Sequence, residues 1–143
     1  GMTDTLDFSG RTALVTGAAS GIGAACARWL DRHGIGHLIL VDVDEAGLAA
    51  LHLTCTTDRV TGSVADPELW ARLEARWDRL DHAIVNAGIG GSGEIAELTL
   101  DEWRRVMAIN CDGAFLTLAA ALRAMRKTGG GSAVVTASVT GIK

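Results

Sequence analysis

The chain has 143 residues, of which 48% are hydrophobic and 21% charged, and its formal net charge is -4 at pH 7. This profile is that of an ordinary globular protein, and the acidic balance argues against a nucleic-acid-binding surface, which needs clustered Lys and Arg. No apolar run approaches the ~20 residues that span a bilayer, and no secretory signal is visible at the N-terminus, so we expect a cytoplasmic protein.

Short apolar runs alternate along the chain with longer amphipathic segments, which is the pattern of β-α-β units around a parallel sheet. Strands are predicted at 11–16, 37–42, 59–64, 81–86 and 132–137. Helices are predicted from Gly21 up to Gly34, over 44–51, from Asp66-Pro67 onward, over 100–109 and through 115–125. Neither an internal repeat nor a linker interrupts this alternation, so we expect one domain.

Two helix starts carry capping signals, and three helices carry an apolar stripe. Asp66 precedes Pro67, which places an N-cap carboxylate before a proline at the first helical position. Thr99 and Glu102 have the spacing of a capping box. The stripes predict buried faces made by Ile22, Ala25, Cys26, Trp29 and Leu30, by Leu69, Trp70, Leu73 and Trp77, and by Phe115, Leu118, Leu122 and Met125.

A glycine-rich loop, Thr16 to Gly23, lies between the first predicted strand and the first predicted helix, with its glycines spaced G-x-x-x-G-x-G. Binding a pyrophosphate requires a tight turn, close approach of the backbone and free N–H groups at a helix start, where the helix dipole also favours anions. Glycines also mark ordinary turns. The strand before, the helix after and an acid 19 positions beyond Gly23 favour a dinucleotide site.

That acid is Asp42, the last residue of the second predicted strand. A carboxylate in this position accepts hydrogen bonds from the adenosine ribose hydroxyls and repels a 2′-phosphate. The glycine loop and the residues directly after Asp42 contain no Arg or Lys to hold such a phosphate. The sequence therefore favours NAD over NADP, against the alternative that Asp42 is only a solvated strand end.

With these motifs the chain resembles the short-chain dehydrogenase/reductase family, whose glycine motif T-G-x-x-x-G-x-G matches Thr16 to Gly23. The family's second signature, N-N-A-G, occurs as Val85-Asn86-Ala87-Gly88, with Val in place of the first Asn. The resemblance implies a Rossmann-type, doubly wound α/β fold with three layers, α/β/α. It implies about five parallel strands in the order 3-2-1-4-5, without the last strands of the family fold.

The resemblance also implies the residues of the site. Cofactor-binding residues are expected to be Gly17, Ser20, Gly21, Ile22, Gly23, Asp42, Ser63, Val64, Asn86, Ala87 and Gly88. Many family members have an Asp near Ser63 that meets the adenine ring, so we expect weaker adenine contacts here.

Two further residues match the family's catalytic positions. Asn110 matches the helix asparagine thought to hold a water next to the catalytic Lys, although a helix Asn with local bonds is the alternative. Ser138, just after the fifth predicted strand, matches the serine that would hydrogen-bond the substrate oxygen.

The family's proton donor is a Tyr that follows the serine by about 13 residues, with a Lys one helical turn later, and such general acid–base help is worth ~10²–10⁴ in rate. Counting from Ser138 places both beyond Lys143, and the 143 residues include no Tyr. In the family, hydride passes between nicotinamide and a carbonyl carbon while the Tyr exchanges the proton. We therefore expect little or no turnover from this polypeptide alone.

Three functions fit these observations to different degrees. The first is an NAD-dependent oxidoreductase acting on a small alcohol or carbonyl substrate; the second is a catalytically inactive dinucleotide-binding module that serves as a sensor or assembly partner. A methyltransferase is a third, but its glycine loop usually starts with an acid and has G-x-G spacing. We expect neither a metal site nor a nucleic-acid or membrane partner, and we expect a homo-oligomer because the fifth strand is a sheet edge.

Overall fold

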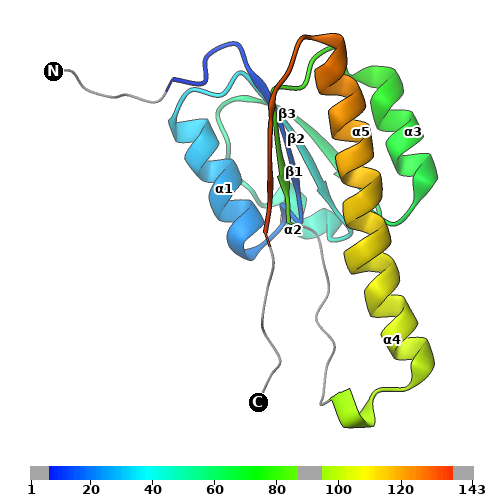
Figure 1. The fold of residues 1–143 in the computed structure, drawn as a ribbon. Coiled ribbons are helices and arrows are strands. Elements are labelled where there is room, and N and C mark those ends of the chain that lie inside the picture. Colours follow the sequence, from blue (N-terminus) through cyan, green and yellow to red (C-terminus); the bar gives the residue numbers. More distant parts are fainter. Residues whose placement is uncertain (1–6, 87–94, 137–143) are drawn as a thin grey trace, which may run out of the picture.

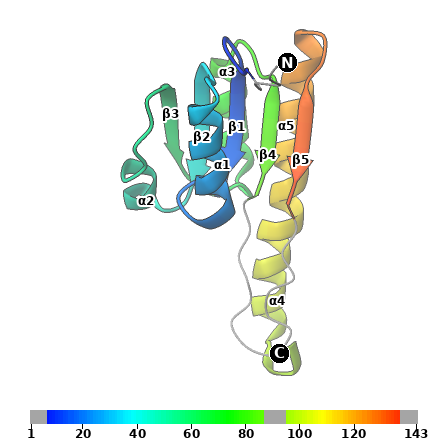
Figure 2. The same ribbon diagram turned by 90° about the vertical axis from the view of Figure 1, so that its left-hand side faces the viewer.

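Five parallel strands form one sheet in the computed structural model of the chain, which describes residues 7–86 and 95–136. The strands are β1 (Thr12–Thr16), β2 (His37–Asp42), β3 (Thr56–Thr61), β4 (His82–Val85) and β5 (Ser132–Val135). Their order across the sheet is β3-β2-β1-β4-β5, which confirms the predicted Rossmann-type order (Figure 2). Every residue of β1 is buried, as expected of a central parallel strand covered on both faces.

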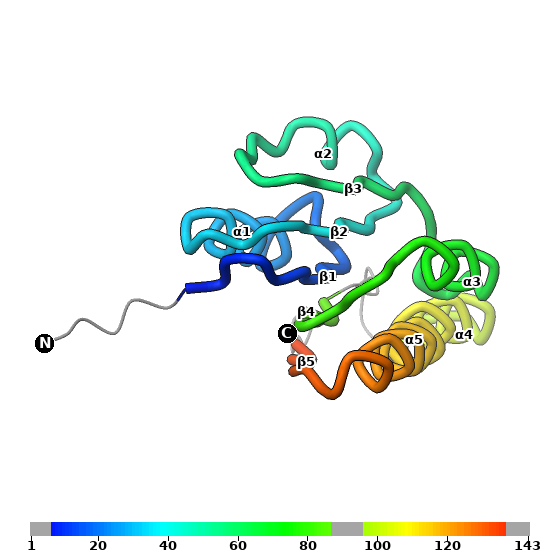
Figure 3. The backbone as a smooth tube through the Cα atoms, turned by 90° about the horizontal axis from the view of Figure 1, so that it is seen from above, coloured from blue at the N-terminus to red at the C-terminus, as the bar shows by residue number. Residues whose placement is uncertain are grey.

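Helices cover both faces of the sheet, giving the expected three layers (Figures 1 and 3). The helices are α1 (Gly21–Arg32), α2 (Glu45–Ala49), α3 (Pro67–Arg76), α4 (Leu100–Met107) and α5 (Gly113–Lys127), with a 3₁₀ turn at Ile95–Glu97 and a π-helical segment at Ala108–Asp112. Successive side chains of β1 point to opposite faces of the sheet, each of which has its own hydrophobic core. Val15 packs with α1 and α2, whereas Leu14 packs with α3 and α5.

The predicted helix starts are confirmed. The Asp66 carboxylate accepts the N–H of Glu68 at 3.0 Å, and Pro67 is the first residue of α3. Thr99 and Glu102 form the reciprocal capping box: the Glu102 N–H donates to the Thr99 hydroxyl at 3.1 Å, and the Thr99 N–H donates to the Glu102 carboxylate at 2.7 Å.

The third strand lies three residues earlier than the predicted 59–64. Thr56–Thr61 pairs along the whole of β2, and the Gly62 N–H then donates to the Asp42 carbonyl at 3.0 Å. β3 is an edge strand whose residues are half-buried or exposed, so its sequence has no apolar run to mark its bounds. Val64 has left the sheet and turns into the core beside Gly113.

The predicted buried faces of the first and last helices were wrong in part: Leu30 and Met125 are buried as predicted, but both helices pack on the sheet mainly through small residues. α1 buries Gly23, Ala24, Ala27 and Leu30. Ile22 stays 59% exposed and Trp29 37% exposed. α5 buries Gly113, Thr117, Ala120, Ala121, Ala124 and Met125. Phe115 and Leu122 point to solvent, 68% and 53% exposed.

One continuous helical rod runs from Leu100 to Lys127 through the π-helical segment, and α4 extends past the edge of the sheet (Figure 1). By length and composition this helical rod of 28 residues could cross a membrane, whereas the sequence contains no uninterrupted apolar run of that length. Its α5 part packs in the core through residues such as Ala120 and Ala121.

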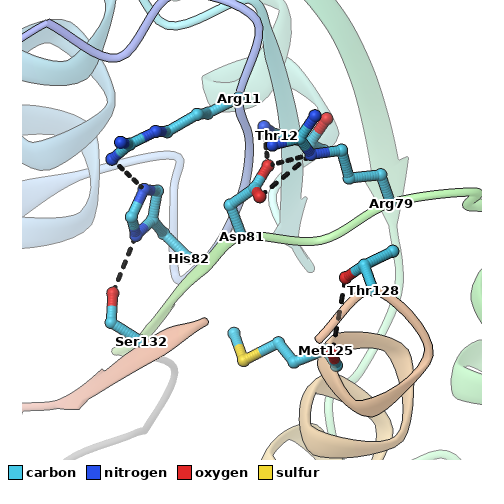
Figure 4. Close-up of polar contacts among 8 residues, drawn as sticks. All are labelled: Arg11, Thr12, Arg79, Asp81, His82, Met125, Thr128 and Ser132. Carbon is cyan, nitrogen blue, oxygen red and sulfur yellow. Dashed lines mark hydrogen bonds and ion pairs between the residues drawn. The ribbon is translucent and has the colours of Figure 1, made fainter. Parts of the chain in front are cut away.

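The amino ends of β1, β4 and β5 are joined by paired side chains (Figure 4). The Asp81 carboxylate, just before β4, accepts the Thr12 N–H at 2.8 Å and the Nε–H of Arg79 at 2.8 and 2.9 Å. His82 Nδ1 lies 2.7 Å from the Ser132 hydroxyl, and Arg11 lies 3.5 Å from the other ring nitrogen. We call this set of residues the amino-edge clamp.

Candidate functional site

The turn between β1 and α1, Thr16 to Gly23, requires glycine at two positions for their backbone angles. Gly17 has φ +62° and Gly21 has φ +55°, in the left-handed region that L side chains rarely adopt. Ser20 precedes α1 in an extended conformation, and its side chain does not cap the helix. Because no side chain caps α1, its first N–H groups can bind an anion, as is common at helix N-termini.

Gly23 is required for a different reason, which is space. A Cβ at this position would lie 2.1 Å from the Gly17 carbonyl oxygen and 2.9 Å from Asn86 Nδ2. A Cβ at Gly21, in contrast, would meet nothing within 4 Å. Gly17 and Gly23 thus pack closely against each other inside the turn. The space beside Gly21 is open, so a ligand can approach the backbone there.

Asp42 is the last residue of β2, and its carboxylate is bonded to the same turn. One oxygen accepts the N–H of Ala19 at 3.0 Å and the other accepts the N–H of Asp44 at 3.0 Å. The Ala18 N–H donates to the Val41 carbonyl at 3.2 Å. Each carboxylate oxygen has a second lone pair, so Asp42 can accept further hydrogen bonds while it stays fixed beside the turn.

Asn86 directly follows β4 and is held from both neighbouring strands. Its main-chain N–H donates to the buried hydroxyl of Thr16, at the end of β1, at 2.9 Å. Its side-chain oxygen accepts the hydroxyl of Thr136, just after β5, at 2.5 Å. Thr16 and Thr136 are the residues that our sequence analysis did not assign to the site. Thr16 lies within the glycine motif, whereas Thr136 carries no signal beyond being a polar residue after an apolar strand.

Ser63 and Val64 follow β3 at the same edge of the sheet. The Ser63 hydroxyl accepts the Ala65 N–H at 3.2 Å. The Val64 side chain is 5% exposed and belongs to the core, and its carbonyl accepts the Trp70 indole N–H at 2.8 Å. A ligand can therefore contact Val64 only through main-chain atoms, whereas it can hydrogen-bond the side-chain hydroxyl of Ser63.

Asn110 lies in the π-helical segment between α4 and α5, with an exposed side chain. π-Helical turns inside α-helices are frequent at functional sites, and no feature of the sequence indicates this one. The predicted site residues Ala87, Gly88 and Ser138 lie outside the described residues. Within 7–86 and 95–136, the structure contains no group of three or more His, Cys, Asp or Glu able to hold a metal.

The structure therefore brings the glycine turn, Asp42, Ser63 and Asn86 to the carboxyl edge of the sheet, where β1 and β4 lie next to each other. In open α/β sheets ligands bind outside this edge, at the point where the strand order reverses. Open backbone at Gly21, an uncapped helix start and a fixed carboxylate fit a pyrophosphate flanked by a ribose.

The family described as short chain dehydrogenase matches residues 11–143. Levodione reductase from Leifsonia aquatica is 40% identical over 97% of this chain and 56% of its own length. D-threitol dehydrogenase from Mycolicibacterium smegmatis is 36% identical over 92% of this chain and 54% of its own length.

Solved structures agree with these matches. A short-chain type dehydrogenase/reductase from Mycobacterium marinum superposes with a TM-score of 0.86 at 28% identity, covering 98% of this chain and 62% of its own. Levodione reductase superposes with a TM-score of 0.83 at 35% identity, covering 92% of this chain and 55% of its own. The chain thus spans little more than half the length of the relatives that it matches.

Proposed function

Because the chain belongs to the short-chain dehydrogenase family, we propose that it forms the NAD-binding part of an oxidoreductase that interconverts a small alcohol and a carbonyl compound. The observation that carries this proposal is the Asp42 carboxylate, bonded at 3.0 Å to Ala19 in the turn that would hold the pyrophosphate. Relatives named as reductases and dehydrogenases of diketones, polyols and hydroxy acids support a small alcohol or carbonyl substrate.

Each part of the site has a separate role in this proposal. The N–H groups of the turn and of the α1 start bind the pyrophosphate, and Asp42 accepts hydrogen bonds from the adenosine ribose hydroxyls. Ser63 and the main chain at Val64 border the adenine, while Ile22 and Asn86 border the nicotinamide half, together with Ala87 and Gly88. Bound NAD supplies the hydride acceptor, and its reduced form supplies the donor.

Ser138 and Asn110 are the catalytic residues of the proposal. Ser138 would hydrogen-bond the substrate oxygen and stabilise charge that develops on it. Asn110 would hold a water near the reacting groups, and its position in a π-helical segment supports a functional role. The 143 residues contain no Tyr. The proton donor of the family mechanism therefore has no counterpart among them, and we expect no alcohol-dependent NADH production from this polypeptide.

A second candidate is a dinucleotide-binding module without turnover, which needs only the cofactor site at the carboxyl edge of the sheet. The two candidates share the cofactor site and differ in the acid–base chemistry. Neither candidate is expected to produce NADH from small alcohols with these 143 residues alone. A reading frame that encodes Tyr-x-x-x-Lys shortly after Lys143 would favour the oxidoreductase, and a frame without it would favour the module. Turnover above the blank would identify an acid–base group that we have not assigned.

We further propose a cytoplasmic homo-oligomer. Cys26, Cys55 and Cys111 are unpaired, as is usual in reducing compartments. Phe115 and Leu122 on α5 are large, apolar and exposed, which supports self-association.

Calorimetric titration with NAD and NADP tests the cofactor proposal. We expect NAD to bind more tightly, and Asp42→Ala to narrow the difference by about 10-fold, because a charge-assisted hydrogen bond is worth about 1.5–3 kcal/mol. Asp44→Ser is the matched control: it removes a neighbouring carboxylate but keeps a residue that can cap α2. Equal affinity of the wild type for the two cofactors, or the same effect in both variants, would refute the role of Asp42.

A further inference from the structure

The side chain of Thr136 links the end of β5 to Asn86 at the end of β4. Thr136 Oγ lies 2.5 Å from Asn86 Oδ1, and the Thr136 N–H donates to the Val85 carbonyl at 3.0 Å. We propose that Thr136 is a positioning residue, which orients the Asn86 side-chain amide so that its N–H₂ group faces the phosphate-binding turn. This inference rests on the proposed function, because it assigns a role within the same cofactor site.

The direction of the hydrogen bond follows from the distances. The Thr136 hydroxyl has one proton and two acceptors within reach, Asn86 Oδ1 at 2.5 Å and the Val85 carbonyl at 3.4 Å. The nearer oxygen takes the proton, since hydrogen bonds between oxygens are strongest near 2.7 Å and weaken at longer distances. An amide whose oxygen is held in this way must turn its nitrogen to the opposite side.

That opposite side is the turn. Asn86 Nδ2 lies 2.9 Å from the position that a Cβ on Gly23 would occupy. Among the described residues Nδ2 has no hydrogen-bond acceptor, and the half-buried Asn86 leaves it access to solvent. The amide therefore presents a donor at the carboxyl edge, next to the third glycine of the motif, where an oxygen of a bound dinucleotide can accept it.

Asn86 needs this second contact because its first one fixes only the main chain. The Thr16 hydroxyl accepts the Asn86 N–H at 2.9 Å but leaves the side chain free to rotate. The terminal torsion of Asn is broad and roughly two-fold, so an amide without a partner on its oxygen exchanges its two orientations easily. β4 lies between β1 and β5. Threonines at the ends of both neighbouring strands thus hold Asn86, one by its backbone and one by its side chain.

The same contact connects two parts of the proposed site. Thr136 and Asn86 are 50 positions apart in the sequence, and Ser138 follows Thr136 by two positions. The hydroxyl that orients the cofactor-side amide therefore lies two positions before the proposed catalytic serine. Removal of this hydroxyl is expected to change cofactor binding before it changes the fold.

Thr136→Val and Thr136→Ser form the matched pair of variants for the test. Valine keeps the shape but lacks the hydroxyl, whereas serine keeps the hydroxyl. We expect Thr136→Val to weaken NADH binding, followed by fluorescence, by about 5-fold to 10-fold, the effect of one net hydrogen bond. Thr136→Ser is expected to restore affinity. In an Asn86→Ala background, Thr136→Val should have little further effect.

Nuclear magnetic resonance gives a readout that does not depend on the cofactor. The sequence contains two asparagines, Asn86 and Asn110, and no glutamine, so a ¹H–¹⁵N spectrum shows two side-chain N–H₂ pairs. We expect the Asn86 pair to shift in Thr136→Val and to return in Thr136→Ser, while the Asn110 pair stays in place. If the valine variant does not fold, Thr136→Ala removes the same hydroxyl.

The outcomes separate this inference from the proposed function. Wild-type protein that fails to bind NADH contradicts the proposed function, and the amide spectrum still tests the link between Thr136 and Asn86. Wild-type binding with an unchanged affinity and an unmoved Asn86 pair in Thr136→Val overturns the positioning role. A lower melting temperature in both Thr136 variants, with no change in NADH affinity, would also overturn it.

Discussion

The two edges of the sheet differ in how their polar groups are satisfied. At the amino edge the clamp pairs its polar groups with one another: the Asp81 carboxylate with the Thr12 main-chain N–H and with Arg79, and His82 with Arg11 and Ser132 (Figure 4). At the carboxyl edge the contacts hold backbone in unusual conformations, as at Gly17 and Gly21. Here main-chain N–H groups of the turn and lone pairs of the Asp42 carboxylate are left to bind a ligand.

This difference indicates that the amino edge of the sheet contributes to stability and the carboxyl edge to ligand binding. A buried group that has a protein partner contributes to stability, as the Thr12 N–H does with Asp81, because loss of the partner leaves a buried donor unsatisfied. Groups fixed in place but with bonding capacity left over are those that can bind a ligand. Substitutions at the amino edge should therefore change stability without changing cofactor binding, and those at the carboxyl edge should change binding.

Gly23→Ala is expected to have the largest effect. Its Cβ would lie 2.1 Å from the Gly17 carbonyl oxygen, so the start of α1 must move. We expect a loss of about 3 kcal/mol or more in the free energy of unfolding, together with loss of NAD binding. Gly21→Ala is the control: its Cβ meets nothing within 4 Å, and the left-handed backbone costs about 1–2 kcal/mol. Equal effects of the two substitutions in chemical denaturation would contradict the close contact at Gly23.

Asp81→Ala is expected to have the next largest effect, on stability alone. It removes the acceptor of the buried Thr12 N–H, which costs about 1–3 kcal/mol. Chemical denaturation gives the change in the free energy of unfolding, and titration with NAD should give the wild-type affinity. Asp81→Asn keeps one acceptor and should lose less. A change in NAD affinity in Asp81→Ala would show that the two edges are not independent.

The pH dependence of stability should reveal the clamp through His82. Burial, followed by the charge of Arg11, lowers the pKa of His82 from 6.5, and Asp81 opposes this shift. A histidine with a lowered pKa in the folded state contributes stability that is complete above pH 6.5 and is lost as the pH falls toward the folded value. The free energy of unfolding should therefore decrease over this range. His82→Asn should flatten the curve, and an unchanged slope in this variant would exclude His82 as the cause.

Asp81 also makes the free energy of unfolding decrease as the pH falls, but in a more acidic range. It therefore changes the slope of this curve little near neutral pH. Burial alone would raise its pKa, but the hydrogen bonds from Thr12 and Arg79 together lower it from 3.8. Its contribution is present above that value and is lost as the pH falls through the folded pKa. Acid unfolding monitored by circular dichroism should begin at a higher pH in Asp81→Asn, and an identical acid midpoint would contradict this.

The sequence predicts the parts of the site that are defined by local spacing. The glycine turn and the two helix caps involve residues close together in the chain, and each requires a particular residue type, whereas Asp42 is marked by its place at the end of a predicted strand. The strand order follows from family resemblance. The sequence does not predict which faces of α1 and α5 are buried, because apolar periodicity gives weight to Trp29 and Phe115. Close packing on the sheet instead selects small residues such as Ala27 and Ala120.

Contacts between distant residues are the other part that sequence could not predict. Thr136 meets Asn86 only because β4 and β5 are neighbours in the sheet. β3 is at an edge and lacks an apolar run, so its bounds become clear only through its pairing with β2. The π-helical segment around Asn110 is followed by Gly113, which packs against Val64, a contact between residues far apart in the chain.

Titration of ¹⁵N-labelled protein with NAD, followed through the backbone amides, tests whether a dinucleotide binds at the carboxyl edge. The largest shifts should occur at residues 17–23, at Asp44 and at Asn86, while the clamp around Asp81 stays unchanged. Binding at the carboxyl edge is contradicted if no amides shift. It is also contradicted if the shifts cluster instead in the groove of about 240 Å³ on the α1 face, lined by Phe8, Trp29 and Val134 among others.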